Sequence, residues 1–220
     1  MPHARVIVHP PQNRYLNMAI DEALLRLCAL PVLRFYQWTE PDAVSIGYFQ
    51  PHADAHGRPF VRRYTGGGLV DHAGDFTYSV ILSKDHPLTV SGTSRSYQLI
   101  HEAVAQGLQR IGATVRLAPA DAEVSSSACF QKAVRHDVVA ADAQKLAGAA
   151  QRRTREGCLH QGSVRLANFT FTSLTRAIGE QLLPLLAADA QESSLSAAEQ
   201  DKALTLERER YATELWNFSR

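Results

Sequence analysis

The sequence has 220 residues, with 23 basic and 22 acidic side chains and a formal net charge of +1 at pH 7. This length suffices for one sizeable hydrophobic core, and the near-zero charge gives no general reason to expect binding to nucleic acid or to an anionic membrane. We therefore expect one domain over residues 1–220, with partners selected by local charge.

Targeting and cysteine patterns point to a cytoplasmic protein. The opening MPHARVIVHPP lacks the apolar stretch of a signal peptide, and no run approaches the roughly 20 apolar residues of a membrane span. Cys28, Cys129 and Cys158 are odd in number and fit no metal-ligand spacing, which is typical of reduced thiols. The sequence thus predicts no membrane segment and no metal site.

The chain begins with a helical pattern and two strand-like runs. Residues 14–28 carry apolar side chains at helical spacing, with Asn13 or Asn17 available as the N-terminal cap. VLRFYQW and AVSIGYF are β-branched and aromatic, and the turn signal Glu40-Pro41-Asp42 separates them. These two runs are predicted to be neighbouring strands.

A glycine-rich loop follows, in Arg62-Arg63-Tyr64-Thr65-Gly66-Gly67-Gly68-Leu69-Val70-Asp71-His72. It lies between the strand-like runs FVRRY and FTYSVIL. Consecutive glycines leave backbone N–H groups unshielded, so an anionic or strongly polar ligand can approach the main chain. The pattern favours a ligand-binding loop over a plain turn.

The second half continues the mixture of helices and strands. A helix that ends at Gly112 is predicted by SRSYQLIHEAVAQGLQRIG, and a short strand by TVRL. Two strands joined by a turn are predicted by DVVAADAQKLAGAAQRR, and one more strand by CLHQGSVRL. Beyond Phe171 the chain is predicted to be helical, with Pro184 breaking the first helix, and residues 119–128 and 187–196 are loop-like. Hairpin-like strand pairs predict an α+β fold with a mixed, largely antiparallel sheet flanked by helices.

Five segments together resemble the lipoate–protein ligase and octanoyltransferase family, which is related to the biotin protein ligases. They are NMAIDEALL, LRFYQW with SIGYFQ, RRYTGGGLVDHAGDFTYSVIL, HDVVAADAQKLAGAAQRR and LHQGSV, in the family's order over roughly residues 13 to 170. The resemblance implies that family's catalytic-domain fold. It also implies transfer of an octanoyl or lipoyl group to a lysine of a lipoyl domain.

The resemblance assigns roles to two residues of this chain. Lys145, in Lys-Leu-Ala-Gly-Ala-Ala-Gln, matches the family lysine whose ammonium contacts the acyl carbonyl. Cys129, in SSACFQKAVRHDVV, resembles the nucleophile of one octanoyltransferase group. A thiolate beside an ammonium has a lowered pKa and accepts an acyl group well. A small buried packing residue is the alternative interpretation of Cys129.

Further residues are implied to form the acyl or lipoyl site. Arg62 and Arg63 alternate faces in an extended run, so only one is expected to point inward, and the prediction takes Arg62. His72 would orient the glycine loop or line the acyl site. The full set of predicted binding residues is Arg62, Gly66, Gly67, Gly68, His72, Gly148, Ala149, Gln161 and Gly162.

The acyl donor leaves alternatives open. An octanoyltransferase would take octanoate from acyl carrier protein through a Cys129 thioester and would need no cofactor. An ATP-dependent lipoate ligase would act through lipoyl-AMP with Mg²⁺, with its accessory domain on a separate subunit, because the residues after LHQGSV leave no room for one. A non-catalytic acyl-binding or lipoyl-domain-binding protein is a third possibility. Biotin ligation is disfavoured because no GRGR-type adenylate loop is present.

The resemblance also implies partners. The acceptor would be a lipoyl-domain protein, either the glycine cleavage H protein or the E2 subunit of a 2-oxoacid dehydrogenase. The donor would be acyl carrier protein. Neither nucleic acid nor a membrane is expected to bind.

Overall fold

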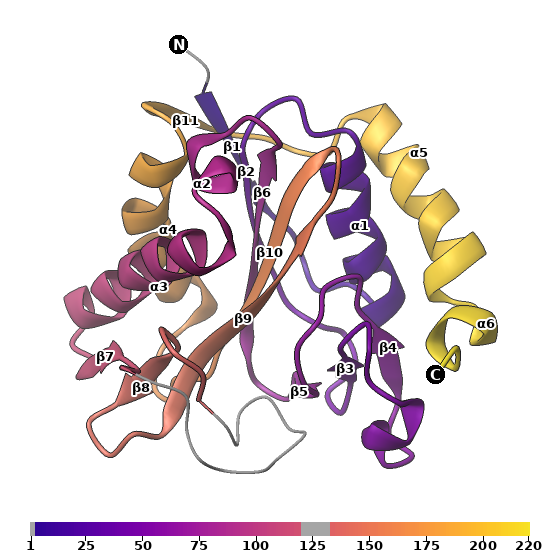
Figure 1. The fold of residues 1–220 in the computed structure, drawn as a ribbon, viewed down its shortest axis with the longest axis horizontal. Helices are drawn as coiled ribbons and strands as arrows, with labels where there is room; N and C mark the ends of the chain where they lie inside the picture. The colour runs from indigo at the N-terminus through magenta and orange to yellow at the C-terminus, as the bar shows by residue number, and fades with distance from the viewer. Residues whose placement is uncertain (1–2, 120–132) are drawn as a thin grey trace.

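The computed structural model describes residues 3–119 and 133–220, which form a large mixed sheet with helices on both faces (Figure 1). The strand order is β11-β1-β2-β6-β10-β9-β8-β7. β1 pairs in parallel with β2 and β11, and the other pairings of this sheet are antiparallel. Its strands are β1 (His3–Val8), β2 (Val32–Tyr36), β6 (Phe76–Ser83), β7 (Val115–Leu117), β8 (Val138–Ala140), β9 (Lys145–Arg153), β10 (Gly157–Val164) and β11 (Asp189–Glu192).

A smaller sheet and two layers of helices complete the fold. The small sheet has the order β4-β3-β5 and consists of β3 (Val44–Ile46), β4 (Phe60–Arg62) and β5 (Val70–Asp71). The helices are α1 (Arg14–Arg26), α2 (Pro87–Val90), α3 (Thr93–Arg110), α4 (Phe171–Leu186), α5 (Ala197–Leu206) and α6 (Glu214–Asn217), with a 3₁₀ turn at His52–Ala55 and a π-helical turn at Glu207–Tyr211. The predicted α+β class is confirmed.

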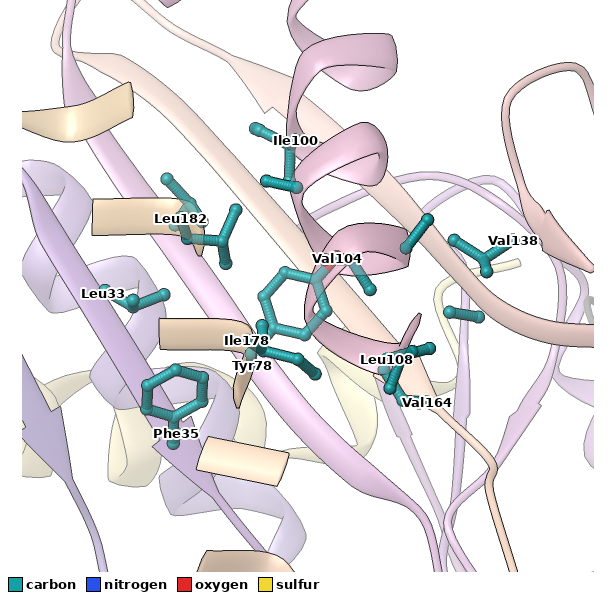
Figure 2. Close-up of a cluster of buried hydrophobic side chains, with 14 of the residues drawn as sticks. Leu33, Phe35, Tyr78, Ile100, Val104, Leu108, Val138, Val164, Ile178 and Leu182 are labelled. Carbon is teal, nitrogen blue, oxygen red and sulfur yellow. The ribbon is translucent and has the colours of Figure 1, made fainter. Parts of the chain in front are cut away.

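Strand alternation creates a core on each face of the sheet. In β6, Tyr78 and Val80 pack with α3 and α4, whereas Ile81 packs with α1 and α5. Figure 2 shows the first cluster, in which Tyr78 lies near Val104 of α3 and Ile178 of α4. Because successive strand residues point to opposite faces, both faces of the central strands are buried. The face that carries α1 also carries the polar side chains of the site described below.

The structure corrects several predicted elements. β2 and β3 are not neighbours, because they belong to different sheets. α4 continues past Pro184 to Leu186, since a proline in the last turn removes only a terminal hydrogen bond. Residues 187–196 are not all loop, because Asp189–Glu192 pairs with β1. Neither β1 nor β11 was predicted as a strand.

Candidate active site

A pocket of about 390 Å³ opens on the α1 face of the large sheet, between α1, the glycine-rich loop and strands β9 and β10. Met18 and Trp38 contribute apolar wall, and Thr77 and Ser163 contribute hydroxyl groups. The structure brings six of the predicted binding residues to this pocket, namely Gly67, His72, Gly148, Ala149, Gln161 and Gly162.

Lys145 begins β9 beside the pocket and is almost fully buried. Its Nζ lies 2.7 Å from Oδ2 of Asp137, and the two side chains are 3% and 0% exposed. The backbone N–H of Val134 donates to the same carboxylate oxygen at 2.7 Å. A buried ion pair of this kind persists only where further hydrogen bonds satisfy the carboxylate. The ammonium is therefore held in a fixed position.

Gly148 provides the space for this lysine. A Cβ at Gly148 would lie 2.3 Å from Cε and 2.5 Å from Nζ of Lys145. The Lys145 side chain therefore folds back over Gly148, which itself lines the pocket. This places a positive charge against the pocket wall, where it could stabilise negative charge on a carbonyl oxygen.

Hydrogen bonds from Arg63 hold the glycine-rich loop. Its guanidinium donates from Nη2 to the carbonyl oxygens of Gly66 (3.0 Å) and Gly68 (2.7 Å), and from Nη1 to the carbonyl of Ser45 (2.8 Å). Gly67 has φ +83°, a conformation that favours glycine. Arg63 thus determines the shape of the loop through its carbonyl groups.

The two arginines differ from the prediction. Arg63 lines the pocket, whereas Arg62 is fully buried elsewhere and donates to backbone carbonyls of Gln50, Trp216 and Asn217. The alternation of strand faces was predicted, but Arg62 was chosen as the inward residue. The geometry instead gives Arg62 a structural role, because α6 packs against β4 and supplies the acceptors on that side.

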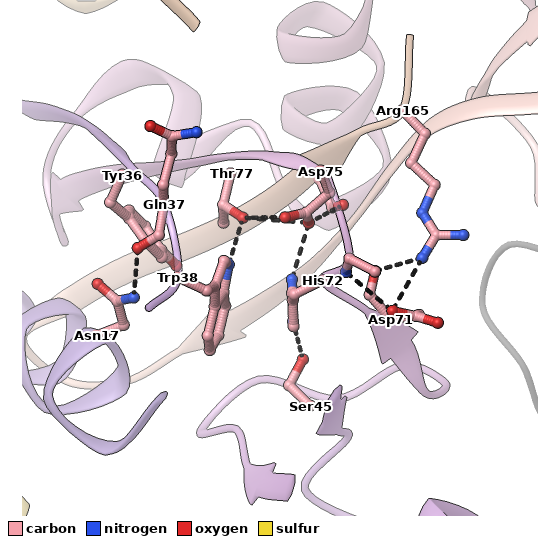
Figure 3. A network of polar contacts seen from close by, with 12 residues as sticks. Asn17, Tyr36, Gln37, Trp38, Ser45, Asp71, His72, Asp75, Thr77 and Arg165 are labelled. Carbon is pink, nitrogen blue, oxygen red and sulfur yellow. Dashed lines mark hydrogen bonds and ion pairs between the residues drawn. The ribbon is translucent and has the colours of Figure 1, made fainter. Parts of the chain in front are cut away.

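His72 belongs to a hydrogen-bonded series on the opposite side of the pocket (Figure 3). Its Nε2 lies 2.7 Å from Oγ of Ser45, and its Nδ1 lies 2.8 Å from Oδ2 of Asp75. Arg63 donates to the same Ser45 Oγ at 2.7 Å, so the guanidinium, the serine hydroxyl and the imidazole form one continuous series. Trp38 stacks on the imidazole at a centroid distance of 3.7 Å. His72 therefore lines the pocket and also supports the loop through Ser45 and Arg63.

Gln161 links the loop to the polar core. Thr65 donates to its Oε1 at 2.7 Å, and its Nε2 donates to Asp21 Oδ2 at 2.7 Å. Asp21 in turn forms a fully buried ion pair with Arg34. The loop is consequently anchored at Thr65 as well as at Arg63.

The remaining predicted glycines serve different purposes. A Cβ at Gly162 would lie 2.2 Å from the Tyr78 ring, so this glycine is required by packing behind the pocket. Gly66 and Gly68 contribute carbonyl acceptors to Arg63 and are not part of the pocket wall. Ala149 lines the wall from β9.

Sequence analysis missed Asp137, Ser45 and Trp38 as site residues. Ser45 and Trp38 act through His72 and Thr77, which are distant in the chain, so no local signal marks them. Asp137 lies only eight residues before Lys145, within the segment HDVVAADAQKLAGAAQRR that carries the family resemblance. Cys129 lies outside the described residues. Among residues 3–119 and 133–220, no group of three or more His, Cys, Asp or Glu side chains could hold a metal ion, and no helix has the length and apolar character needed to cross a membrane.

Buried histidines surround the back of the site. Burial lowers the pKa of His101 to about 4 and the pKa of His160 well below its ordinary value, and burial also lowers the pKa of His9 to about 4. His101 donates from Nδ1 to the carbonyl of His136 at 2.8 Å. All three side chains are therefore neutral at pH 7.

We expect the free energy of unfolding to fall as pH drops below the unfolded histidine pKa of about 6.5, because the unfolded state then binds more protons. Each buried histidine contributes a slope of about 1.4 kcal/mol per pH unit until its folded pKa is reached. Urea unfolding between pH 7.5 and 4.5 measures this slope. In the variant His101→Gln, the slope of the unfolding free energy against pH should decrease by the equivalent of about one proton. An unchanged slope would contradict the assignment of His101 as a buried neutral histidine.

With this geometry established, comparisons with known proteins identify the family. The model of the lipoyl protein ligase A/B catalytic domain matches residues 13–183. The chain belongs to this family. The predicted family relationship is confirmed.

Relatives within the lipoyl protein ligase A/B family divide into transferases and ligases. The octanoyltransferase LipM of Brevibacillus brevis is 36% identical over 182 residues, covering 74% of this chain and 65% of that protein. LipM of Kyrpidia tusciae is 38% identical over 169 residues, covering 68% of this chain and 61% of that protein. The match thus spans less than two thirds of these relatives.

Solved structures share the fold at lower identity. A lipoate-protein ligase A bound with ATP superposes with a TM-score of 0.79 at 24% identity, covering 98% of each chain. A bipartite lipoate protein ligase from Thermoplasma acidophilum gives a TM-score of 0.76 at 24% identity, covering 99% of this chain and 97% of that one. These structures establish the lipoyl protein ligase A/B fold for this chain.

Proposed function

We propose that this chain transfers an octanoyl group from octanoyl–acyl carrier protein to a lysine of a lipoyl domain. The observation that carries the proposal is the Lys145 ammonium, fixed by Asp137 and Gly148 against a pocket in a lipoyl protein ligase A/B fold. The relatives of 36% and 38% identity, which are named octanoyltransferases, favour octanoyl transfer.

In the proposed first step, the Cys129 thiolate attacks the thioester carbonyl of the donor. The carbon–sulfur bond to the carrier breaks, the carrier thiol leaves, and octanoyl-Cys129 forms. The acyl chain would occupy the pocket beside Met18 and Trp38, where apolar surface is available. Lys145 would stabilise the negative charge that develops on the carbonyl oxygen.

In the proposed second step, the ε-amine of the acceptor lysine attacks the same carbonyl. A carbon–nitrogen bond forms, the bond to the Cys129 sulfur breaks, and the thiol is regenerated with the proton that the amine loses. No cofactor is consumed in either step. Lys145 would again face the developing oxyanion, so one fixed ammonium serves both halves of the reaction.

The acceptor would be a lipoyl-domain protein such as the glycine cleavage H protein or a 2-oxoacid dehydrogenase E2 subunit. The Thermoplasma acidophilum lipoylation system consists of a bipartite ligase and its E2 lipoyl domain, which supports this class of acceptor.

ATP-dependent lipoate ligation is the second candidate function, because a ligase of the same fold binds ATP. It would require ATP and Mg²⁺. We place the reaction in the cytoplasm.

Intact-mass spectrometry tests the proposal directly. The purified protein is incubated with octanoyl–acyl carrier protein, beside the variant Cys129→Ser. We expect an octanoyl adduct on the unmodified protein that hydroxylamine removes and that the variant lacks. Adding a lipoyl domain should then move the octanoyl group to the acceptor.

A parallel reaction contains ATP, Mg²⁺, lipoate and the lipoyl domain. Modification of the lipoyl domain that requires ATP and is unaffected by Cys129→Ser would replace the transferase proposal with the ligase. The variant Cys158→Ser is the matched control, since Cys158 is a buried thiol in β10 whose pKa is raised by burial. It should retain the adduct.

A further inference from the structure

Tyr97, in the first turns of α3, connects β9, which forms one wall of the pocket, to Asp137, the ion-pair partner of Lys145. Its hydroxyl lies 2.5 Å from Oδ1 of Asp137. The backbone N–H of Ala149 donates to the same hydroxyl at 3.1 Å, and the Ala149 carbonyl lies 3.3 Å away. A phenol has one hydrogen to donate. The shorter distance assigns that hydrogen to Asp137.

The carboxylate of Asp137 is thus held at both oxygens. Tyr97 donates to Oδ1, while Val134 N–H and Lys145 Nζ donate to Oδ2. Rotation of the carboxylate would break contacts on both sides. The donation from Tyr97 to an ionised carboxylate is a charge-assisted hydrogen bond, which strengthens this arrangement.

We propose that Tyr97 is a positioning residue that fixes the location of the Lys145 ammonium through Asp137. The same hydroxyl holds Ala149, which lines the pocket, so the ammonium and the adjacent wall share one anchor. The effect on catalysis rests on the proposed function, in which Lys145 faces the acyl carbonyl. The effect on Lys145 itself does not.

Within residues 3–119 and 133–220, Asp137 pairs with Lys145, and the titratable side chains of His101 and Tyr78 lie near that pair. The ring of His101 in α3 packs against Tyr97 with centroids 4.1 Å apart and the ring planes tilted by 44°, and burial lowers the pKa of His101 to about 4. Burial raises the pKa of Tyr78 in β6 well above its ordinary value. Both side chains are neutral at pH 7. His136, whose carbonyl accepts from His101, is the other titratable neighbour.

The variant Tyr97→Phe removes one oxygen and retains the ring. We expect the rate of octanoyl transfer at saturating substrate to fall about 10- to 100-fold, with KM for the donor within about twofold of its original value. Without the Tyr97 hydrogen bond, the Asp137 carboxylate is held on one side only, so the Lys145 ammonium should move relative to the pocket wall.

Nuclear magnetic resonance of ¹³C-labelled lysine reports the surroundings of the Lys145 side chain without any substrate, through its ε-carbon chemical shift at a fixed pH. The sequence contains only four lysines, so the ε-carbon signals can be assigned by substitution. The matched control is Tyr211→Phe, which removes a buried hydroxyl that donates to Glu22 at 2.6 Å and lies outside the pocket. This control should leave the transfer rate and the Lys145 ε-carbon shift unchanged.

The two measurements separate the two proposals. A changed Lys145 ε-carbon shift in Tyr97→Phe, with no transfer by the unmodified protein, would support the positioning role and overturn the proposed function. An unchanged ε-carbon shift and an unchanged rate in Tyr97→Phe would overturn the positioning role. Equal changes in Tyr211→Phe would also overturn it, because they would reflect a general loss of structure.

Discussion

Lys145→Met should reduce the maximal rate of octanoyl transfer by about 10²- to 10³-fold, equivalent to about 3–4 kcal/mol of transition-state stabilisation. Methionine fills the volume of the lysine stem but carries no charge. Because the ammonium is proposed to act on charge that develops in the transition state, the loss should fall on kcat and leave KM for the donor nearly unchanged. Single-turnover transfer from octanoyl–acyl carrier protein measures it.

A folding control is required because Lys145→Met leaves Asp137 buried without its cation, which is destabilising. The double variant K145M/D137N removes both charges and should recover stability in urea without recovering activity. Activity near that of the unmodified protein in either variant would show that the ammonium is not part of the transfer step.

Gly148→Ala tests the same ammonium without changing the residue Lys145 itself. Because the added Cβ would overlap Cε and Nζ, the side chain must move, and we expect the rate to fall about 10- to 100-fold. Gly179→Ala in α4 is the matched control, since its Cβ would meet Phe35 at an ordinary 3.7 Å. Equal rates in the two variants would contradict the geometry.

Asp21→Asn should produce the largest loss of stability, about 3–5 kcal/mol in the free energy of unfolding. Asp21 and Arg34 are both 0% exposed, and Nη1 of Arg34 lies 2.7 Å from Oδ1 of Asp21. Asp21 Oδ2 also accepts hydrogen bonds from Ser79 (2.6 Å) and Gln161 (2.7 Å). Neutralising the carboxylate leaves a guanidinium buried without its counter-charge.

Urea unfolding at pH 7 measures this loss. The matched control is Glu180→Gln, which removes a carboxylate from the exposed pair with Arg176 (82% and 47% exposed) and should change stability by less than about 1 kcal/mol. A similar small change in Asp21→Asn would show that Arg34 finds other compensation. Because Gln161 joins Asp21 to Thr65 of the loop, Asp21→Asn should also slow transfer.

Most of the helices and strands were predicted, because caps, turns and apolar spacing depend on residues that are neighbours in the sequence. Asn13 does cap α1, as its side chain accepts from the N–H groups of Tyr15 and Leu16. The apolar spacing of α3 and the turn between β8 and β9 were likewise predicted from neighbouring residues. The short edge strand β11 was missed, because residues 189–192 are exposed and polar and form a strand only by pairing with β1.

The sequence by itself determined the family, the α+β class and the glycine-rich loop, and it singled out Lys145 as the candidate catalytic residue, because these depend on residue types in a fixed order. Only the tertiary structure decided that Arg63 rather than Arg62 faces the pocket, and that Asp137 holds Lys145. It also joined Ser45, His72 and Asp75. The physical reason is that a strand offers two faces, and the elements that pack on each face decide which side chains meet.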